Sequence, residues 1–267
     1  MQEITSTNNA KVRYLLQLKR KSSARKEFKE FVIEGKREII SALKNGYEIK
    51  SLFFCPSLIS EKEILDLSNQ YDIQTVFFRL ARQVYQKVAY RDSTEGIIAL
   101  AKMKAQGINE LKLQENPIVL VAEGIEKPGN IGAMLRSVDG SGADALILVN
   151  PVVDIYNPNV IRASIGMVFS TQIAVTGLKG LQNWLSEQGI SLYAATLQNS
   201  SLYYKQNFKK PVALAVGAED KGLSNEMRDL AAGQVYIPMN GQADSLNVSV
   251  SAAILLYEAV RQRNTHI

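Results

Sequence analysis

The second half of the chain alternates short apolar runs with segments of helical periodicity. The apolar runs are PIVLVAEG, ADALILVN, STQIAV, SLYAAT and PVALAVG. Most have near-continuous apolar centres, which is typical of parallel strands covered on both faces. Between the runs lie the helical patterns NIGAMLRSVDGSG, NPNVIRASIG and LKGLQNWLSEQG. This alternation predicts a parallel α/β sheet, in which ligands bind beyond the carboxyl ends of the strands.

The first hundred residues form a smaller alternating α/β pattern. FVIEG, IKSLFFC, IQTVFF and EGIIALA read as strands, and helices are predicted over 11–18, 36–45 and 61–69. The polar stretch KMKAQGINELKLQENP follows. We therefore predict a small α/β domain over 1–105, a linker over 106–116 and a parallel-sheet domain over 117–267.

Composition narrows the class of protein. At 267 residues and 46% hydrophobic content, the chain is able to bury two cores. Its apolar runs are far shorter than a membrane span, and its first residues lack the apolar core of a signal peptide. A lone cysteine, Cys55, excludes an internal disulfide or a cysteine-rich metal cluster and fits a reducing cytoplasm. We expect a cytoplasmic protein that uses neither a membrane nor a metal.

Positive charge gathers at the N-terminus. Residues 1–30 hold eight Lys or Arg against three Glu, an excess of +5 that equals the net charge of the whole chain. Such clustering indicates a polyanionic partner such as RNA. We expect phosphate contacts from four side chains, Lys19, Arg20, Lys21 and Arg25. The alternative is that KRKSSARK is only a solvated loop after a helix.

The first polar loop of the second half is EGIEKPGNIGAMLRS. Its glycines allow close backbone approach, and a helix beginning near Asn130 would offer unpaired N–H groups to an anion. Arg136 would lie about two turns into that helix. The glycine spacing differs from the dinucleotide-binding pattern, and the chain has no nucleoside-triphosphate loop. A nicotinamide or flavin enzyme is therefore disfavoured.

Two further polar loops follow later strands. In AVGAEDKGLSNEMRDL, Gly217 ends a strand, Glu219 follows, and Ser224 is a credible helix N-cap; a simple capping turn explains this loop equally well. In IPMNGQADSLNVSVSAAILLYEAV, we expect Asp244 or Ser245 to cap the last helix.

Asn247 would then lie inside the first turn of that helix, where a polar side chain points to solvent or to a ligand. The single histidine, His266, is next to last in the chain. The most frequent acid–base catalyst is therefore not expected in the site.

These three loops, in this order, resemble the three motifs of the SpoU (TrmH) family of ribose methyltransferases. The matching stretches are NIGAMLRS, GAEDKGLS and IPMNGQADSLNVSVSAAILLYE, within residues 117–263. The N-terminal pattern ITSTNNAKVRYLLQLKRKSSARKEFKEFVIEG resembles the RNA-substrate-binding domain of the same family. With that domain present, the chain is most similar to the subgroup that acts on large-subunit ribosomal RNA.

The resemblance implies S-adenosylmethionine as the methyl donor and a ribose 2′-hydroxyl of RNA, preferably 23S ribosomal RNA, as the acceptor. It also implies a SPOUT-like C-terminal domain with a deep trefoil knot, and a homodimer formed through the catalytic domain. By motif, the cofactor-binding residues are Thr196, Leu197, Gly217, Ile237, Met239 and Leu246. The reaction-site residues are Asn130, Arg136, Glu219, Ser245 and Asn247.

The chemistry makes these residue types sensible. A sulfonium methyl is already electrophilic, so the enzyme has mainly to align the hydroxyl oxygen with it and help that oxygen lose its proton. Arg136 would bind the neighbouring phosphate or stabilise charge on the ribose oxygen, since a guanidinium is a poor base. Asn130 and Asn247 would orient groups by hydrogen bonding. Glu219 would hold Arg136 or another loop, or form a purely structural ion pair.

Three alternatives stay open. The substrate of a family member with these motifs is in some cases transfer RNA, and a role in antibiotic resistance is compatible with the same motifs. A non-catalytic RNA-binding or ribosome-assembly protein that has lost its cofactor is the alternative from another class. Ser251, at a position where alanine is frequent in the family, affects the fit of the substrate rather than the reaction.

Overall fold

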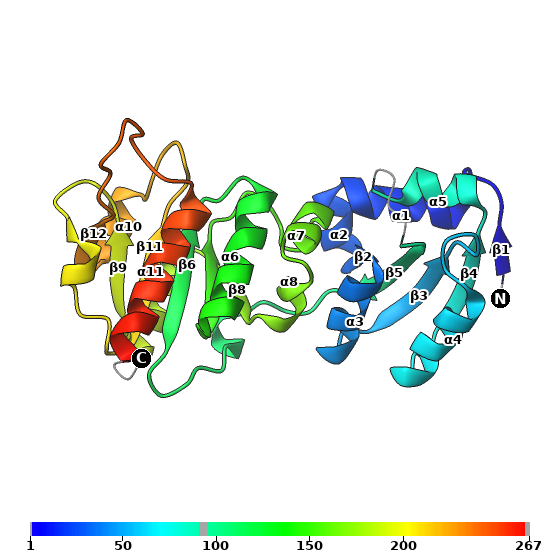
Figure 1. Cartoon of the computed structure of the whole chain (residues 1–267), viewed down its shortest axis with the longest axis horizontal. Coiled ribbons are helices and arrows are strands. Elements are labelled where there is room, and N and C mark those ends of the chain that lie inside the picture. Colours follow the sequence, from blue (N-terminus) through cyan, green and yellow to red (C-terminus); the bar gives the residue numbers. More distant parts are fainter. Residues whose placement is uncertain (1, 91–94, 265–267) are drawn as a thin grey trace. The chain divides into compact units, whose positions relative to one another are not determined.

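The structure is a computed structural model that describes residues 2–90 and 95–264 (Figure 1). His266 lies outside the described residues. None of the described helices is long and apolar enough to cross a membrane.

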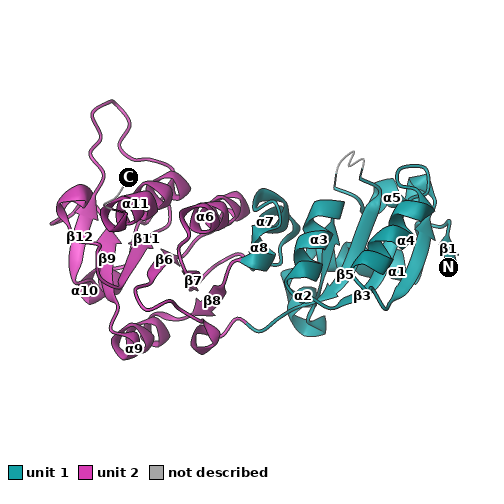
Figure 2. Ribbon diagram, turned by 60° about the horizontal axis from the view of Figure 1, so that its bottom comes forward, with its two compact units in different colours: residues 1–105, 154–170 teal, residues 106–153, 171–267 magenta. Residues whose placement is uncertain are grey.

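Contacts divide the chain into two compact units, coloured separately in Figure 2. Unit 1 contains residues 1–105 and 154–170, and unit 2 contains residues 106–153 and 171–267. Residues 154–170, predicted to belong to the C-terminal domain, are grouped with unit 1 by their contacts in the structure.

Unit 1 is built on a five-stranded mixed sheet in the order β1-β4-β3-β5-β2. Its strands are β1 (Gln2–Ile4), β2 (Glu30–Glu34), β3 (Ile49–Phe54), β4 (Val76–Leu80) and β5 (Ile97–Lys102). Its helices are α1 (Ala10–Arg20), α2 (Ser22–Phe28), α3 (Lys36–Lys44), α4 (Glu61–Gln70), α5 (Arg82–Val88), α7 (Pro158–Ala163) and α8 (Met167–Ser170). Strand β5 runs antiparallel to both of its neighbours, and the remaining pairs are parallel.

The alternative that KRKSSARK is a solvated loop is wrong, because the segment is helical. Helix α1 ends at Arg20 and α2 begins at Ser22, so only Lys21 lies between them. The side chain of Lys19 forms an ion pair with Glu34 at 2.9 Å and also donates to the carbonyl of Val88. A phosphate contact from Lys19 would require breaking this pair, whereas Arg20 and Lys21 are exposed.

Arg25 is also an internal residue rather than a surface cation. Its guanidinium is 2% exposed and donates to both carboxylate oxygens of Asp154, at 3.0 and 2.5 Å. Next to this pair along the chain, Tyr156 packs on Phe31 with ring centroids 4.3 Å apart. These contacts fasten residues 154–170 to unit 1, which explains the grouping, and they correct the expectation that Arg25 contacts RNA.

Unit 2 is a seven-stranded sheet in the order β10-β12-β9-β11-β6-β7-β8, and every pair in it is parallel. Its strands are β6 (Ile118–Glu123), β7 (Ala145–Val149), β8 (Ile173–Thr176), β9 (Ser191–Ala195), β10 (Ser201–Leu202), β11 (Val212–Val216) and β12 (Gly233–Tyr236). Its helices are η1 (Ile108–Glu110), α6 (Pro128–Ser141), α9 (Leu178–Gln188), η2 (Tyr203–Lys205), α10 (Asn225–Leu230) and α11 (Val248–Arg263). The predicted parallel α/β sheet is confirmed, and the short strands β10 and β12 are additions to it.

Two helical layers cover this sheet. On one face, Leu181 and Trp184 of α9 and Met227 of α10 join a core with Val121 and Ile147. On the other face, α6 and α11 pack against each other and lie over β6, β7 and β11 (Figure 1). Because all strands are parallel, the loops after β6, β9, β11 and β12 leave the sheet at the same edge.

The buried Arg25–Asp154 pair generates a prediction about stability. Arg25→Ala leaves the Asp154 carboxylate without its partner, so the free energy of unfolding of unit 1 falls by about 3–5 kcal/mol. Urea denaturation of the full chain followed by circular dichroism measures the change. The control is Arg20→Ala, an exposed residue one helix away, for which a change within about 0.5 kcal/mol is expected. Equal midpoints for the two variants would contradict the structural role of Arg25.

Candidate active site

The loops after β6 and β11 are joined by a buried carboxylate. Glu123, at the end of β6, accepts hydrogen bonds from the backbone N–H of Ser224 at 2.8 Å and from its hydroxyl at 2.7 Å. Ser224 also caps α10, as predicted, by accepting from the N–H of Met227. A β-carbon on Gly217 would collide with the backbone of Gly222, so the β11 loop itself requires glycine there. The sequence analysis missed Glu123, although an acidic residue that ends a buried strand was the available signal.

The last helix begins later than predicted. Helix α11 starts at Val248, and its N-cap is Asn247, whose side-chain oxygen accepts from the N–H of Ser249 at 3.0 Å. Neither Asp244 nor Ser245 is the cap, and Asn247 is not inside the first turn, because its backbone is not helical (ψ 139°). The cap therefore uses the oxygen of the Asn247 amide and leaves its nitrogen available.

That nitrogen belongs to a cluster that contains residues of all three motifs. The amide of Asn247 donates to Oε1 of Glu219 at 2.7 Å and to Oδ1 of Asn130 at 3.1 Å. Asn130 donates to the same oxygen of Glu219 at 3.3 Å. Lys127 forms an ion pair with the other carboxylate oxygen. We call Lys127, Asn130, Glu219 and Asn247 the polar cluster; the structure brings together three of the five predicted reaction-site residues in it.

Electrostatics in the polar cluster centre on one ion pair. Lys127 lowers the pKa of Glu219 below its ordinary value, with further hydrogen bonds from Asn130 and Asn247. In return, Glu219 raises the pKa of Lys127. Both groups are therefore charged at neutral pH. Glu219 thus holds the β6 loop through Lys127, a residue that the sequence analysis did not single out.

A cavity of about 140 Å³ lies between the loops after β9 and β12 and the approach to α11. Five of the six predicted cofactor-binding residues line it, namely Thr196, Leu197, Ile237, Met239 and Leu246. Ser245 and Ser251 line this cavity too, and Ser245 takes no part in the hydrogen bonds that join the polar cluster in the described part of the chain. The sixth, Gly217, is not among the lining residues. A second hollow of about 260 Å³ opens beside Lys127, Asn130 and Glu219.

Arg136 does not join the polar cluster. Helix α6 begins at Pro128, two residues before the predicted start, which places Arg136 in its third turn. Six residues separate it from Asn130, a rotation of about 240° around the helix axis. The Arg136 side chain is exposed, and no hydrogen bond or ion pair joins it to the described part of the chain. Of the alternatives for Glu219, contact with Arg136 is therefore wrong, and contact with another loop is what the structure has, through Lys127 and Asn130.

The arrangement is typical of ligand-binding α/β enzymes. A parallel α/β sheet carries an apolar cavity and a charged amide–carboxylate cluster at the carboxyl edge of its strands, which is where enzymes of this architecture bind ligands. Among the described residues, no group of three or more His, Cys, Asp or Glu side chains is placed to hold a metal ion.

Comparison with known families identifies the chain further. Residues 117–257 match the SpoU rRNA Methylase family, and residues 9–99 match the MRM3-like substrate binding domain. The chain belongs to the SpoU rRNA methylase family. It is an S-adenosylmethionine-dependent enzyme of the α/β class, as the resemblance implies. The trefoil knot stays a prediction.

Relatives resemble the chain over nearly its whole length. The 23S rRNA (guanosine(2553)-2′-O)-methyltransferase RlmP of Bacillus subtilis is 29% identical, covering 96% of this chain and 98% of its own. A crystal structure of an RNA 2′-O ribose methyltransferase is 40% identical with a TM-score of 0.83, covering 98% of this chain and 99% of the other. The SpoU methyltransferase AviRb of Streptomyces viridochromogenes, in complex with the cofactor AdoMet, is 28% identical with a TM-score of 0.89, covering 97% and 99%.

Proposed function

We propose that the protein transfers a methyl group from S-adenosylmethionine to a ribose 2′-hydroxyl of large-subunit ribosomal RNA. The observation that carries the proposal is the convergence of Asn130, Glu219 and Asn247, from three separate loops, in a chain of the SpoU family. Two relatives, RlmP and the Streptomyces viridochromogenes enzyme, are named for 23S rRNA 2′-O-methylation. We infer a cytoplasmic location, which is compatible with a substrate of this kind.

The cavity beside α11 suits the proposed cofactor. Leu197, Ile237, Met239 and Leu246 offer apolar contacts for an adenosine, and Thr196 adds a hydroxyl. When bound, S-adenosylmethionine supplies a methyl group on a positively charged sulfur. The chain has only to hold it and to bring the acceptor oxygen into line.

The polar cluster orients the acceptor ribose. Amide groups of Asn130 and Asn247 provide both donors and acceptors, and Glu219, kept ionised by Lys127, is an acceptor. These groups fix the direction of the hydroxyl oxygen before reaction. Arg136 acts electrostatically, because a guanidinium does not accept a proton near neutral pH but stabilises growing negative charge or an adjacent phosphate.

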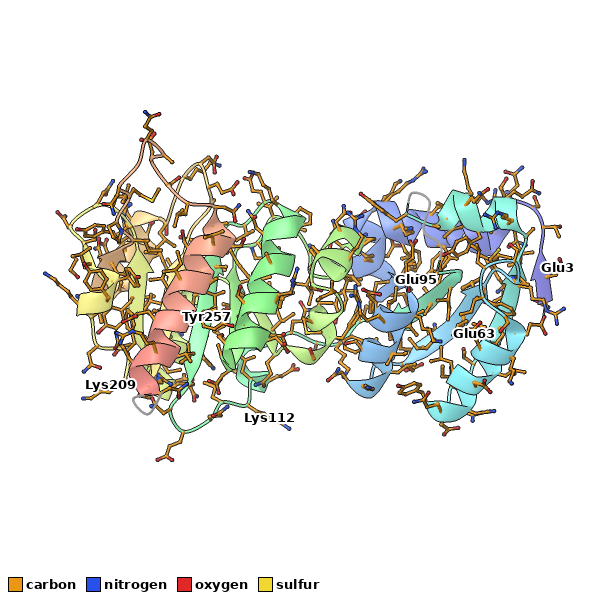
Figure 3. The ribbon with its side chains drawn as sticks, viewed as in Figure 1. Glu3, Glu63, Glu95, Lys112, Lys209 and Tyr257 are labelled. Atoms are coloured by element: carbon orange, nitrogen blue, oxygen red, sulfur yellow. The ribbon has the colours of Figure 1, made fainter. Side chains whose placement is uncertain are left out.

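We also propose a homodimer through the catalytic unit. Val250 and Tyr257, one heptad apart on α11, are 45% and 51% exposed, although they are large apolar or aromatic residues. Figure 3 labels Tyr257 on this helix. On the neighbouring α6, Gly140 is exposed, and a β-carbon there would lie 3.2 Å from the hydroxyl of Tyr257. Arg136 is on the same exposed side of α6, so a partner copy packed on this face contacts it.

Arg136 provides the test of mechanism. The wild-type chain is expected to transfer labelled methyl from S-adenosylmethionine to 23S ribosomal RNA, and Arg136→Ala to lower the rate by about 10²- to 10³-fold. Arg136→Lys keeps the charge but not the planar fork, so its rate is expected to lie between the two. Isothermal titration with S-adenosylmethionine is expected to give unchanged affinity for both variants.

Loss of cofactor affinity in Arg136→Ala would contradict the electrostatic role. Absence of any heat of binding in the wild-type chain would instead favour the non-catalytic RNA-binding or assembly protein. Faster methylation of transfer RNA than of ribosomal RNA would show that transfer RNA is the preferred substrate.

The exposed cations Arg20 and Lys21 are expected to contact phosphates of the RNA. Changing either one to Ala should weaken binding across RNA sequences and reduce the slope of log affinity against log salt by roughly 1. Fluorescence anisotropy at several salt concentrations measures the slope. Lys62→Ala, an exposed lysine on α4, is the control with an unchanged slope. If the salt slopes of the Arg20→Ala and Lys21→Ala variants equal that of Lys62→Ala, Arg20 and Lys21 do not contact phosphates.

The dimer has its own test. Tyr257→Asp introduces a charge into the proposed apolar contact, so sedimentation velocity is expected to show a shift from dimer to monomer. Val76→Asp is the control, because Val76 is also exposed, at 56%, but lies in unit 1. A wild-type chain that sediments as a monomer at micromolar concentration contradicts the proposal.

A further inference from the structure

Unit 1 contains a cavity that the methyl-transfer chemistry does not use. Its volume is about 260 Å³, somewhat below the range of pockets for drug-sized ligands, so it has room for a single small ring system. Its lining includes three carboxylates, one aromatic ring and two guanidinium groups, from Glu34, Glu38, Glu95, Tyr90, Arg37 and Arg162. All belong to unit 1, and Figure 3 labels Glu95. We call this space the unit 1 cavity.

The inner part of the unit 1 cavity is rich in hydrogen-bond acceptors. The Glu38 side chain is 5% exposed, and its Oε1 accepts from the guanidinium of Arg37 at 3.1 and 2.6 Å. Its other oxygen, Oε2, receives no hydrogen bond from the described residues. Because this oxygen is not one of the fully buried atoms that lack a partner, it is accessible from the cavity that Glu38 lines, and it is able to accept a hydrogen bond from a ligand there.

A second carboxylate lies beside it. The Oε2 atoms of Glu38 and Glu95 lie 2.5 and 3.0 Å from the point where a β-carbon on Gly35 would stand, so they are no more than 5.5 Å apart. Gly35 has a φ of 104°, a conformation that glycine adopts readily, and the missing side chain leaves this space open. Oε2 of Glu95 already accepts from the backbone N–H of Lys36 at 2.6 Å, whereas Oε2 of Glu38 has no donor among the described residues. Two neighbouring carboxylates with acceptor capacity left favour a ligand whose edge presents adjacent hydrogen-bond donors.

The outer part of the cavity offers a stacking surface and positive charge. The guanidinium carbon of Arg162 lies 4.1 Å from the centroid of the Tyr90 ring. Unpaired bases of RNA stack on such guanidinium planes and aromatic rings. Arg162 is exposed, and the side chain of Arg37 is 61% exposed, so both are placed to meet a phosphate.

We infer that the unit 1 cavity binds one unpaired guanine of the RNA substrate, an inference that rests on the proposed function. The Watson–Crick edge of guanine carries an imino N–H beside an amino group, two adjacent donors that match a carboxylate. Uracil offers one N–H between two carbonyl oxygens, which would face Glu38 and Glu95 unfavourably, and adenine and cytosine offer an amino group alone. The lining residues of the cofactor cavity all belong to unit 2, so this guanine is a recognition nucleotide and not the methylated one.

Titration of the full chain with guanosine 5′-monophosphate and uridine 5′-monophosphate tests the inference. Calorimetry is expected to show binding of the guanine nucleotide at least tenfold tighter than that of the uracil nucleotide. Glu38→Gln replaces the acceptor oxygen without changing the shape of the side chain and is expected to weaken guanine binding at least tenfold. Glu48→Gln, on an ion-paired glutamate that is 59% exposed, is the matched control with unchanged affinity.

Arg162→Ala gives an independent measurement if Glu38→Gln fails to fold, because the Arg162 side chain is exposed. Loss of its stacking plane is expected to weaken guanine binding about tenfold. Equal affinity for the two nucleotides, or unchanged guanine affinity in both Glu38→Gln and Arg162→Ala, overturns the inference. Cofactor titration and methyl transfer on the same samples separate the two proposals. An active enzyme without guanine preference overturns the guanine site alone. Guanine preference without cofactor binding supports the guanine site and contradicts the proposed function.

Discussion

The parallel pairing of strands in unit 2 is the constraint on which the candidate active site depends. Because β6, β9, β11 and β12 all point the same way, loops separated by more than a hundred residues leave one edge of the sheet together. An antiparallel strand in any of these places would send its loop to the opposite edge. The hydrogen bonds from Ser224 to Glu123 then hold the β6 and β11 loops at a fixed separation. The direction of the strands brings the loops together, and the hydrogen bonds of the polar cluster depend on that arrangement.

The side chain of Asn247 both caps helix α11 and helps to form the polar cluster. Its oxygen satisfies a backbone N–H at the start of α11, and this bond turns the amide nitrogen toward Glu219 and Asn130. An aspartate would cap the helix equally well but would present a second negative charge to Glu219. The Glu219 side chain is 28% exposed, so solvent screening keeps its pair with Lys127 from contributing much to stability. The contribution of the cluster to stability is therefore small, which is compatible with the proposed role of its members in orienting the acceptor ribose.

The features that the sequence predicted correctly are those encoded locally. Near-continuous apolar runs identified the parallel strands, and Ser224 was recognisable as a cap from the residues that follow it. The short motifs predicted Asn130, Glu219 and Asn247 as site residues, and hydrogen bonds join these three side chains in the structure.

The features that were missed depend on partners far away in the chain. Nothing near Arg25 shows that Asp154, 129 residues later, neutralises it, and nothing near Lys127 shows that Glu219 is its partner. The start of α11 was misplaced because Asp244, Ser245 and Asn247 are all good caps, and only the backbone conformation selects one of them.

The internal pairing of Lys19 and Arg25 changes how the basic N-terminus is understood. Two of the eight positive charges in residues 1–30 are committed to Glu34 and Asp154, so the excess charge available to a polyanion is carried by exposed side chains such as Arg20 and Lys21. Exposed cations attract phosphates without regard to sequence, which provides affinity but no selection among nucleotides. Selection requires acceptors and donors held at fixed positions away from water, because an unmatched base then leaves buried groups unpaired. In the proposed guanine site the carboxylate of Glu38 meets that requirement, whereas the exposed N-terminal basic residues do not. Under that proposal, affinity for RNA and choice of RNA depend on different side chains of unit 1.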